Sequence, residues 1–126
     1  MDRDVIHTAL WVSDIDETID FYVEGLGLDR NWSFESDGVE NVYVGGSDGE
    51  FQFKHDPDGD RPTGPGGGFA HVAVGVESTD DAFERLVERR DPTVVEAPAT
   101  MDEIGVRVAF VEDPDGYVVE LVEELS

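Results

Sequence analysis

Four residues in this sequence have the types and the positions of metal ligands. His7 and His71 each open an apolar, strand-like segment. Gln52 lies between two phenylalanines, and Glu120 lies in the apolar run 117–122. Imidazole and carboxylate are ordinary ligands of zinc, nickel, manganese, cobalt and ferrous iron, and an amide oxygen can act as a neutral fourth ligand. The sequence therefore predicts one divalent metal ion bound by His7, Gln52, His71 and Glu120.

Glu120 is the residue that most needs a cationic partner. Its neighbours are typical of a well-buried strand, where an unpaired carboxylate is strongly destabilising. Lys54 is the only lysine of the chain, so few side chains can compensate this charge. Because the chain has no cysteine, nitrogen and oxygen atoms must supply all ligands of any metal.

The elements that must position these residues occur twice. In the first half, the pattern predicts a strand at 5–12, a helix at 14–25 and strands at about 28–36, 40–45 and 50–55. In the second half, it predicts a strand at 70–76, a helix at about 80–89 and strands near 93–97, 105–112 and 117–124. Each half is thus one β-α-β-β-β module. A shift of 64 residues aligns the halves and places His7 on His71 and Asp16 on Asp80.

Alternation of side chains along a strand decides which residues share a face. His7 shares its face with Ala9, and His71 shares its face with Ala73. The branched apolar residues between them belong against the helices, so both histidines face the opposite side beside small residues. We expect an α+β fold in which two modules form a curved, partly closed mixed sheet, with helices on its outer, convex side.

The length and the charge of the chain limit its organisation and its partners. We expect a single domain over residues 1–126, with module one at about 4–56, a linker at about 57–69 and module two at about 70–126. The net charge of −23 makes nucleic acid an improbable partner and indicates a halophile's surface. The N-terminus resembles neither a secretory signal nor a membrane span, so we expect a cytoplasmic protein.

Each candidate ligand also has a purely structural interpretation. A single histidine at a strand start is usually structural, a glutamate late in a strand can reach solvent, and a glutamine between phenylalanines can lie on an edge strand. Matched positions in two repeats favour the metal site over these separate explanations. The third histidine, His55, has the opposite parity to Gln52 and is given no role.

Several motifs resemble the vicinal oxygen chelate superfamily of glyoxalase I, bleomycin resistance proteins and extradiol dioxygenases. The similarity covers nearly the whole chain, and its last stretch is most similar to bacterial glyoxalase I, also called lactoylglutathione lyase. The motifs are His7-Thr8, Asp20-Phe21-Tyr22 with Gly25-Leu26-Gly27-Leu28, His71-Val72-Ala73, and the stretch Phe110 to Leu121, which reads FVEDPDGYVVEL.

The resemblance implies paired modules, metal ligands at the four positions named above, and a homodimer whose metal sites lie between modules of different subunits. Bacterial glyoxalase I usually has glutamate where this chain has Gln52. A glutamine at this ligand position resembles the arrangement in methylmalonyl-CoA epimerase. Glutathione-using members carry arginine and asparagine where this chain has Trp11 and Asp56. These departures concern glutathione, so the identity of the thiol stays open.

The expected reaction converts a hemithioacetal of a 2-oxoaldehyde and a small thiol into a 2-hydroxyacyl thioester through an enediolate. A divalent metal would act as Lewis acid, Glu120 as base, and the thiol as cosubstrate. Because Gln52 is neutral, Glu120 must act on both carbons or Glu50 must assist. One alternative is another metalloenzyme of the superfamily, either an acyl-CoA epimerase or a ferrous dioxygenase. The other is a metal-free resistance protein that binds a drug.

Overall fold

The computed structural model describes residues 5–59 and 61–125. It divides the chain into two compact units, one up to Gly64 and one from Pro65. Each unit has the element order β-α-β-β-β and forms its own open sheet of four strands. The expected α+β class and the two modules are therefore confirmed, whereas the sheets are not closed and the single domain stays a prediction.

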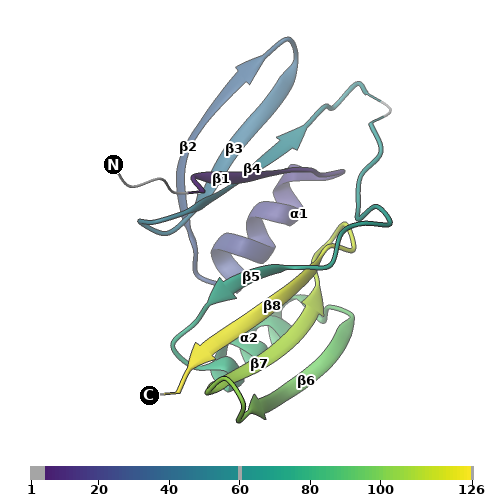
Figure 1. Ribbon diagram of the computed structural model, residues 1–126. Coiled ribbons are helices and arrows are strands. Elements are labelled where there is room, and N and C mark those ends of the chain that lie inside the picture. Colours follow the sequence, from purple (N-terminus) through teal and green to yellow (C-terminus); the bar gives the residue numbers. More distant parts are fainter. Residues whose placement is uncertain (1–4, 60, 126) are drawn as a thin grey trace. The chain divides into compact units, whose positions relative to one another are not determined.

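The first unit contains a mixed sheet in the order β1-β4-β3-β2 (Figure 1). Its strands are β1 (His7–Trp11), β2 (Asp29–Ser36), β3 (Val39–Gly45) and β4 (Glu50–His55). β1 pairs with β4 in parallel, and the other neighbours are antiparallel. This order places β4, which carries Gln52, in the interior of the sheet beside the strand of His7.

The helix expected at 14–25 is two consecutive segments, α1 (Ile15–Ile19) and the π-helical η1 (Asp20–Gly25). The carboxylate of Asp14 caps the start by accepting the Glu17 backbone N–H at 3.1 Å. Near the end, the Leu26 N–H donates to the Phe21 carbonyl five residues earlier, which is the π-helical spacing. Gly27 then takes a φ of +81°, a conformation that glycine adopts at little cost, and the helix stops.

An apolar face of the first sheet packs against this helix. Leu10, Val44 and Phe53 are buried, and the Tyr22 ring lies 4.7 Å from the Phe53 ring. The residues next to them in the strands, including Gln52, face the other way because side chains alternate. The helix therefore covers one face and leaves uncovered the other, which carries Gln52.

The second unit repeats this plan with the sheet order β5-β8-β7-β6 (Figure 1). Its elements are β5 (Val72–Gly75), α2 (Thr79–Arg90), β6 (Val94–Met101), β7 (Val106–Glu112) and β8 (Val118–Glu124). β5 begins at Val72 because its parallel pairing with β8 starts there, so His71 stands just before the strand. β6 is longer than expected, because an edge strand tolerates Pro98.

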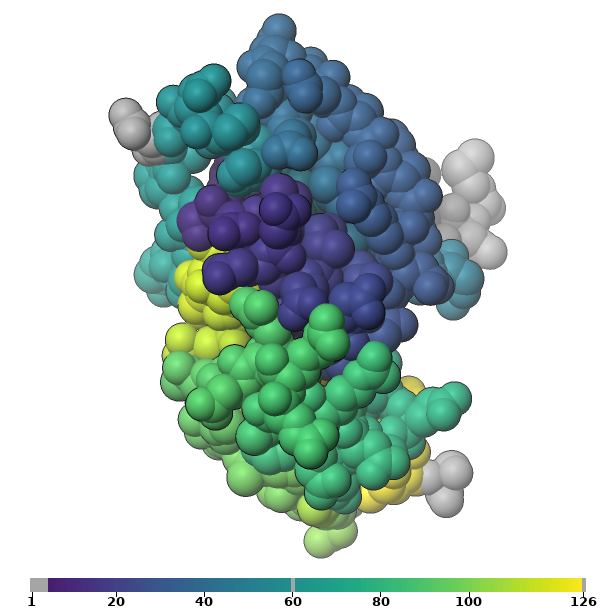
Figure 2. Space-filling view, turned by 180° about the vertical axis from the view of Figure 1, so that it is seen from behind, coloured from purple at the N-terminus to yellow at the C-terminus, as the bar shows by residue number. Residues whose placement is uncertain are grey.

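Both helices lie at the surface of their own units. Seen from behind, the purple N-terminal residues and the green residues of the second half form exposed surface (Figure 2). Within the part of the chain that the structure describes, no helix is long and apolar enough to cross a membrane.

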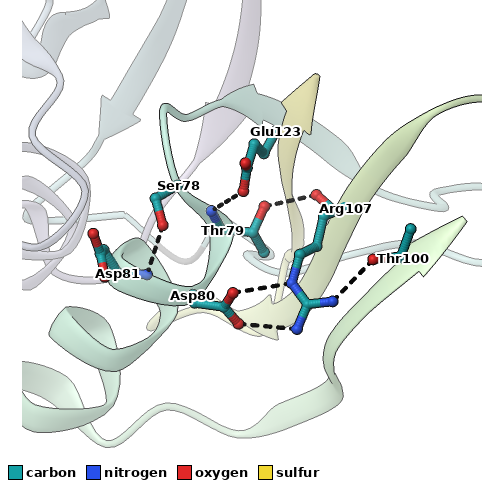
Figure 3. A network of polar contacts seen from close by, with 7 residues as sticks. All are labelled: Ser78, Thr79, Asp80, Asp81, Thr100, Arg107 and Glu123. Carbon is teal, nitrogen blue, oxygen red and sulfur yellow. Dashed lines mark hydrogen bonds and ion pairs between the residues drawn. The ribbon is translucent and has the colours of Figure 1, made fainter. Parts of the chain in front are cut away.

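A network of polar contacts joins α2 to β7 and β8 (Figure 3). Arg107 donates to both carboxylate oxygens of Asp80 at 3.0 and 3.1 Å, a hydrogen-bonded pair that raises the pKa of Arg107. The hydroxyl of Thr79 donates to the Arg107 carbonyl at 2.6 Å, and the Thr79 N–H donates to Glu123 at 2.9 Å. These contacts fix α2 to β8, the strand that carries Glu120.

Replacement of Thr79 by valine tests this attachment. The side chain of Thr79 is fully buried, so Thr79→Val should lower the free energy of unfolding by about 1–3 kcal/mol, because the Arg107 carbonyl loses its hydroxyl donor. Urea unfolding followed by circular dichroism measures the change. Thr100→Val removes an exposed hydroxyl that Arg107 also contacts, and it should change stability by less than roughly 0.5 kcal/mol. Equal effects of the two substitutions would contradict this interpretation.

Candidate functional site

The first unit brings two of the predicted ligands to the same face of its sheet. In the parallel pairing of β1 and β4, His7 stands opposite Glu50 and Ala9 stands opposite Gln52. Paired residues point to the same side, so His7 and Gln52 are diagonal neighbours on the face away from α1. The strand alternation read from the sequence is confirmed for this pair of strands.

Hydrogen bonds and ring contacts hold both side chains. Gln52 is 8% exposed, and its Nε2 donates to Oδ1 of the buried Asn41 at 2.9 Å. Tyr43 stands opposite Gln52 in the antiparallel register with β3. The ring of Tyr43 contacts the His7 imidazole edge to face, with 5.7 Å between centroids. The amide nitrogen of Gln52 is therefore hydrogen-bonded to Asn41, and the His7 imidazole packs against the Tyr43 ring.

The second unit brings the other two predicted ligands into direct contact. The Nε2 atom of His71 lies 3.2 Å from Oε1 of Glu120. The Glu120 side chain is 17% exposed, and its neighbours Val119 and Leu121 are fully buried. The imidazole of His71 also packs edge to face on Phe110, the residue opposite Glu120 in β7. Sequence reasoning gave Phe110 no role, because its contact with His71 depends on the register of β7 and β8.

The contact between His71 and Glu120 fits two ligands of one metal ion. Zinc bonds to imidazole nitrogen and carboxylate oxygen are about 2.0–2.2 Å long, so two such atoms lie roughly 2.8–3.6 Å apart at octahedral to tetrahedral angles. The observed separation of 3.2 Å falls within this range. A cation between them would also compensate the carboxylate in its apolar strand. This pair therefore offers two donor atoms of the kinds that a divalent metal binds, at a separation that one ion can bridge.

The four predicted ligands divide between the units, with His7 and Gln52 in the first and His71 and Glu120 in the second. Each unit presents one pair. In residues 5–59 and 61–125, no group of three or more histidine, aspartate or glutamate side chains is placed to hold a metal. The complete set of four stays a prediction.

Other residues singled out in the sequence lie elsewhere in the first unit. His55 stands opposite Glu40, and its Nδ1 lies 2.9 Å from the Glu40 carboxylate, on the face opposite Gln52. Trp11 and Asp56 are the two residues that depart from the glutathione-using pattern. Together with Arg61 they line a cavity of about 210 Å³. The guanidinium of Arg61 lies 4.3 Å from the Trp11 ring. In this chain, position 11 therefore holds an aromatic ring with the guanidinium of Arg61 over it.

A stack of aromatic rings on the face of His7 was not recognised in the sequence. The rings of Trp32 and Tyr43 are parallel within 5°, with centroids 4.0 Å apart, and Phe34 stacks beside Trp32 at 5.6 Å. Trp32 is 50% exposed and Phe34 is 43% exposed. Their spacing of two residues indicated a shared face, but the stack on Tyr43 requires the pairing of β2 with β3. This platform can accept a planar apolar group.

Comparison with known proteins gives one family and several full-length similarities. Residues 5–121 match the family described as the Glyoxalase/Bleomycin resistance protein/Dioxygenase superfamily. A protein of Synechocystis sp. named probable lactoylglutathione lyase is 32% identical, over 97% of this chain and 96% of its own length.

Solved structures give the same picture of the fold. A mutant of glyoxalase I from Zea mays superposes with a TM-score of 0.84 over 98% of this chain and 46% of its own chain. Its sequence identity is 22%, so this similarity concerns the fold alone. TnmS3, an antibiotic-binding protein from Streptomyces sp. CB03234, is 26% identical with a TM-score of 0.77, and the match covers 99% of this chain and 98% of that chain.

The three histidines allow a direct test of the candidate ligands. Addition of Zn²⁺ should shift the imidazole signals of His7 and His71 in a long-range ¹H–¹⁵N correlation spectrum, because a metal binds an imidazole through a ring nitrogen. His55 is the matched control, since it faces the other side of the sheet and contacts Glu40. Signals of His55 that moved with the others, or no movement at all, would contradict the assignment.

Proposed function

Because the chain belongs to the glyoxalase/bleomycin resistance protein/dioxygenase superfamily, we propose that it is a metal-dependent lyase or isomerase of the glyoxalase I type. Its substrate would be the hemithioacetal of a 2-oxoaldehyde and a small thiol, and its product a 2-hydroxyacyl thioester. The observation that carries this proposal is the contact of His71 with Glu120 at 3.2 Å, where Glu120 is the one charged residue in the run 117–122.

The proposed ligands of the metal are His7, Gln52, His71 and Glu120. The family resemblance and the donor atoms, two imidazoles, one amide oxygen and one carboxylate, support this set. A bound divalent ion supplies Lewis acidity, which stabilises negative charge on two adjacent oxygens of the substrate. Zinc, nickel, manganese, cobalt and ferrous iron are all compatible with nitrogen and oxygen ligands.

Glu120 is the proposed general base. The Glu120 side chain is 17% exposed and contacts His71, so a substrate bound at the proposed metal would meet a carboxylate that is partly withdrawn from water. Glu120 would take the proton from one carbon and return it to the adjacent carbon. Glu50 is available as an assistant, because it stands opposite His7 and the Asn31 amide donates to it at 2.8 Å.

The chain is further proposed to act as a homodimer at high salt. The family resemblance implies the dimer, and the net charge of −23 supports the salt requirement. At molar ionic strength the screening length falls to roughly 3 Å, which weakens repulsion between surface carboxylates. The assay should therefore combine methylglyoxal with several thiols and several metals in molar KCl.

The substitution Glu120→Gln tests the proposed reaction. It should lower turnover by roughly 10²–10⁴-fold, because it removes the base and keeps the size of the side chain. Thioester formation measures turnover, and elemental analysis reports bound metal. Glu124→Gln, on the same strand and the same face, should keep full turnover. Full turnover of Glu120→Gln with metal still bound would refute the assigned role.

The exposed aromatic stack supports a second candidate function, the binding of a planar aromatic molecule without chemistry. Trp32 and Phe34 offer a half-exposed apolar surface on the face of His7. TnmS3, whose structure is similar to this chain at 26% identity, is an antibiotic-binding protein. This function would make the metal unnecessary and would classify the chain with the resistance proteins.

Binding of neutral fused-ring aromatics to metal-free protein tests the second candidate. Trp32→Ala should weaken binding about five- to tenfold, because stacking of a ring pair contributes roughly 1 kcal/mol beyond burial. Fluorescence titration gives the affinity. Ile104→Ala removes an exposed apolar side chain from the other unit and should leave the affinity unchanged. If wild type binds none of the aromatics, or if Trp32→Ala binds them equally well, this candidate fails.

A further inference from the structure

The buried amide of Asn41 has a contact pattern that the proposed mechanism does not use. Asn41 is 2% exposed, and its Oδ1 accepts two hydrogen bonds, from Lys54 Nζ at 2.7 Å and from Gln52 Nε2 at 2.9 Å. Its Nδ2 donates to the Val39 carbonyl at 3.2 Å. Asn41 therefore connects the proposed amide ligand to a cation and to the backbone of β3.

We propose that Asn41 is a positioning residue, which turns the amide of Gln52 so that Oε1 faces the metal. The inference rests on the proposed metal site, because it assigns Gln52 its ligand atom. An amide can bind a divalent cation only through its oxygen, since the NH₂ group has no lone pair available for a metal. A Gln52 side chain with the reverse orientation would present NH₂ to the metal and would not bind it.

The orientation of the Asn41 and Gln52 amides follows from two hydrogen-bond partners of Asn41, one that can only donate and one that can only accept. An ammonium group only donates, so the atom of Asn41 that faces Lys54 must be the oxygen. A backbone carbonyl only accepts, so the atom that faces Val39 must be the nitrogen. Because Oδ1 of Asn41 also faces Gln52, that residue must direct its own NH₂ toward Asn41. Its Oε1 is then the atom left for a ligand role.

The pairing of β3 with β4 makes these hydrogen bonds of Asn41 possible. Lys54 stands opposite Asn41, and Gln52 stands opposite Tyr43, two residues further along β3. Asn41 and Gln52 are therefore diagonal neighbours on one face, within reach of each other's side chains. Lys54 is the only lysine in a chain with 31 acidic residues, and it lies on the same face of the first sheet as His7 and Gln52.

Zinc affinity measured by competition with a chromogenic chelator tests the inference. Asn41→Leu should weaken Zn²⁺ binding about 10–100-fold, the usual effect of losing a group that orients a ligand. Asn41→Asp should retain affinity within about threefold, because its carboxylate still accepts from Gln52 and Lys54. Asn31→Leu is the matched control, since the amide of Asn31 contacts Glu50 and not Gln52, and it should leave the affinity unchanged.

A double substitution separates positioning from a general structural effect. In Gln52→Glu protein either carboxylate oxygen can bind the metal, so no orientation is required and Asn41→Leu should cost less than about threefold in affinity. Loss of the same large factor in both backgrounds would overturn the inference. Asn41→Ala is measured in parallel, and urea unfolding of the metal-free variants checks their folding.

The outcomes distinguish this inference from the proposed function. If wild type binds none of Zn²⁺, Ni²⁺, Mn²⁺, Co²⁺ and Fe²⁺, both fail. If Gln52→Leu weakens Zn²⁺ binding and Asn41→Leu and Asn41→Ala do not, only the inference fails. A shift of the Gln52 side-chain ¹³Cδ signal on addition of Zn²⁺, present in wild type and lost in Asn41→Leu, would support coordination through Oε1.

Discussion

Alternation of side chains in strands that carry a helix on one face is the constraint on which the candidate site depends. Leu10 and Phe53 must face α1, because burying apolar surface is the main driving force for packing the helix. The pleat then turns His7 and Gln52 to the other face. The same rule in the second unit places Glu120 away from α2, whereas Leu121 is buried. A shift of one residue in register would bury the proposed ligands and expose the core.

Most of the fold could be predicted because its signals are local. Apolar periodicity gave β4 correctly and gave the other strands and α2 within a few residues. The differences arise where pairing or geometry decides. The first helix ends in a π-helical segment because of how Leu26 and Phe21 are hydrogen-bonded, and β6 continues through Pro98 because it lies at a sheet edge. Composition alone contains neither fact.

The candidate site was only partly visible in the sequence. The internal repeat indicated His7 and His71, and the apolar run 117–122 indicated Glu120. The structure places His71 in contact with Glu120. The groups around the ligands were not predicted. The Asn41 contact with Gln52 and the Phe110 contact with His71 join residues on different strands, so they depend on register. The contact of Lys54, the single lysine, with Asn41 was not predicted either.

Anomalous diffraction from crystals grown with Zn²⁺ tests the central claim most directly, because it locates the ion without reference to activity. The account predicts one ion bonded to an imidazole nitrogen of His7 and of His71 and to oxygens of Gln52 and Glu120, at about 2.0–2.2 Å. An ion bound instead at His55 or at surface carboxylates, or crystals without any ion near His71 and Glu120, would contradict it.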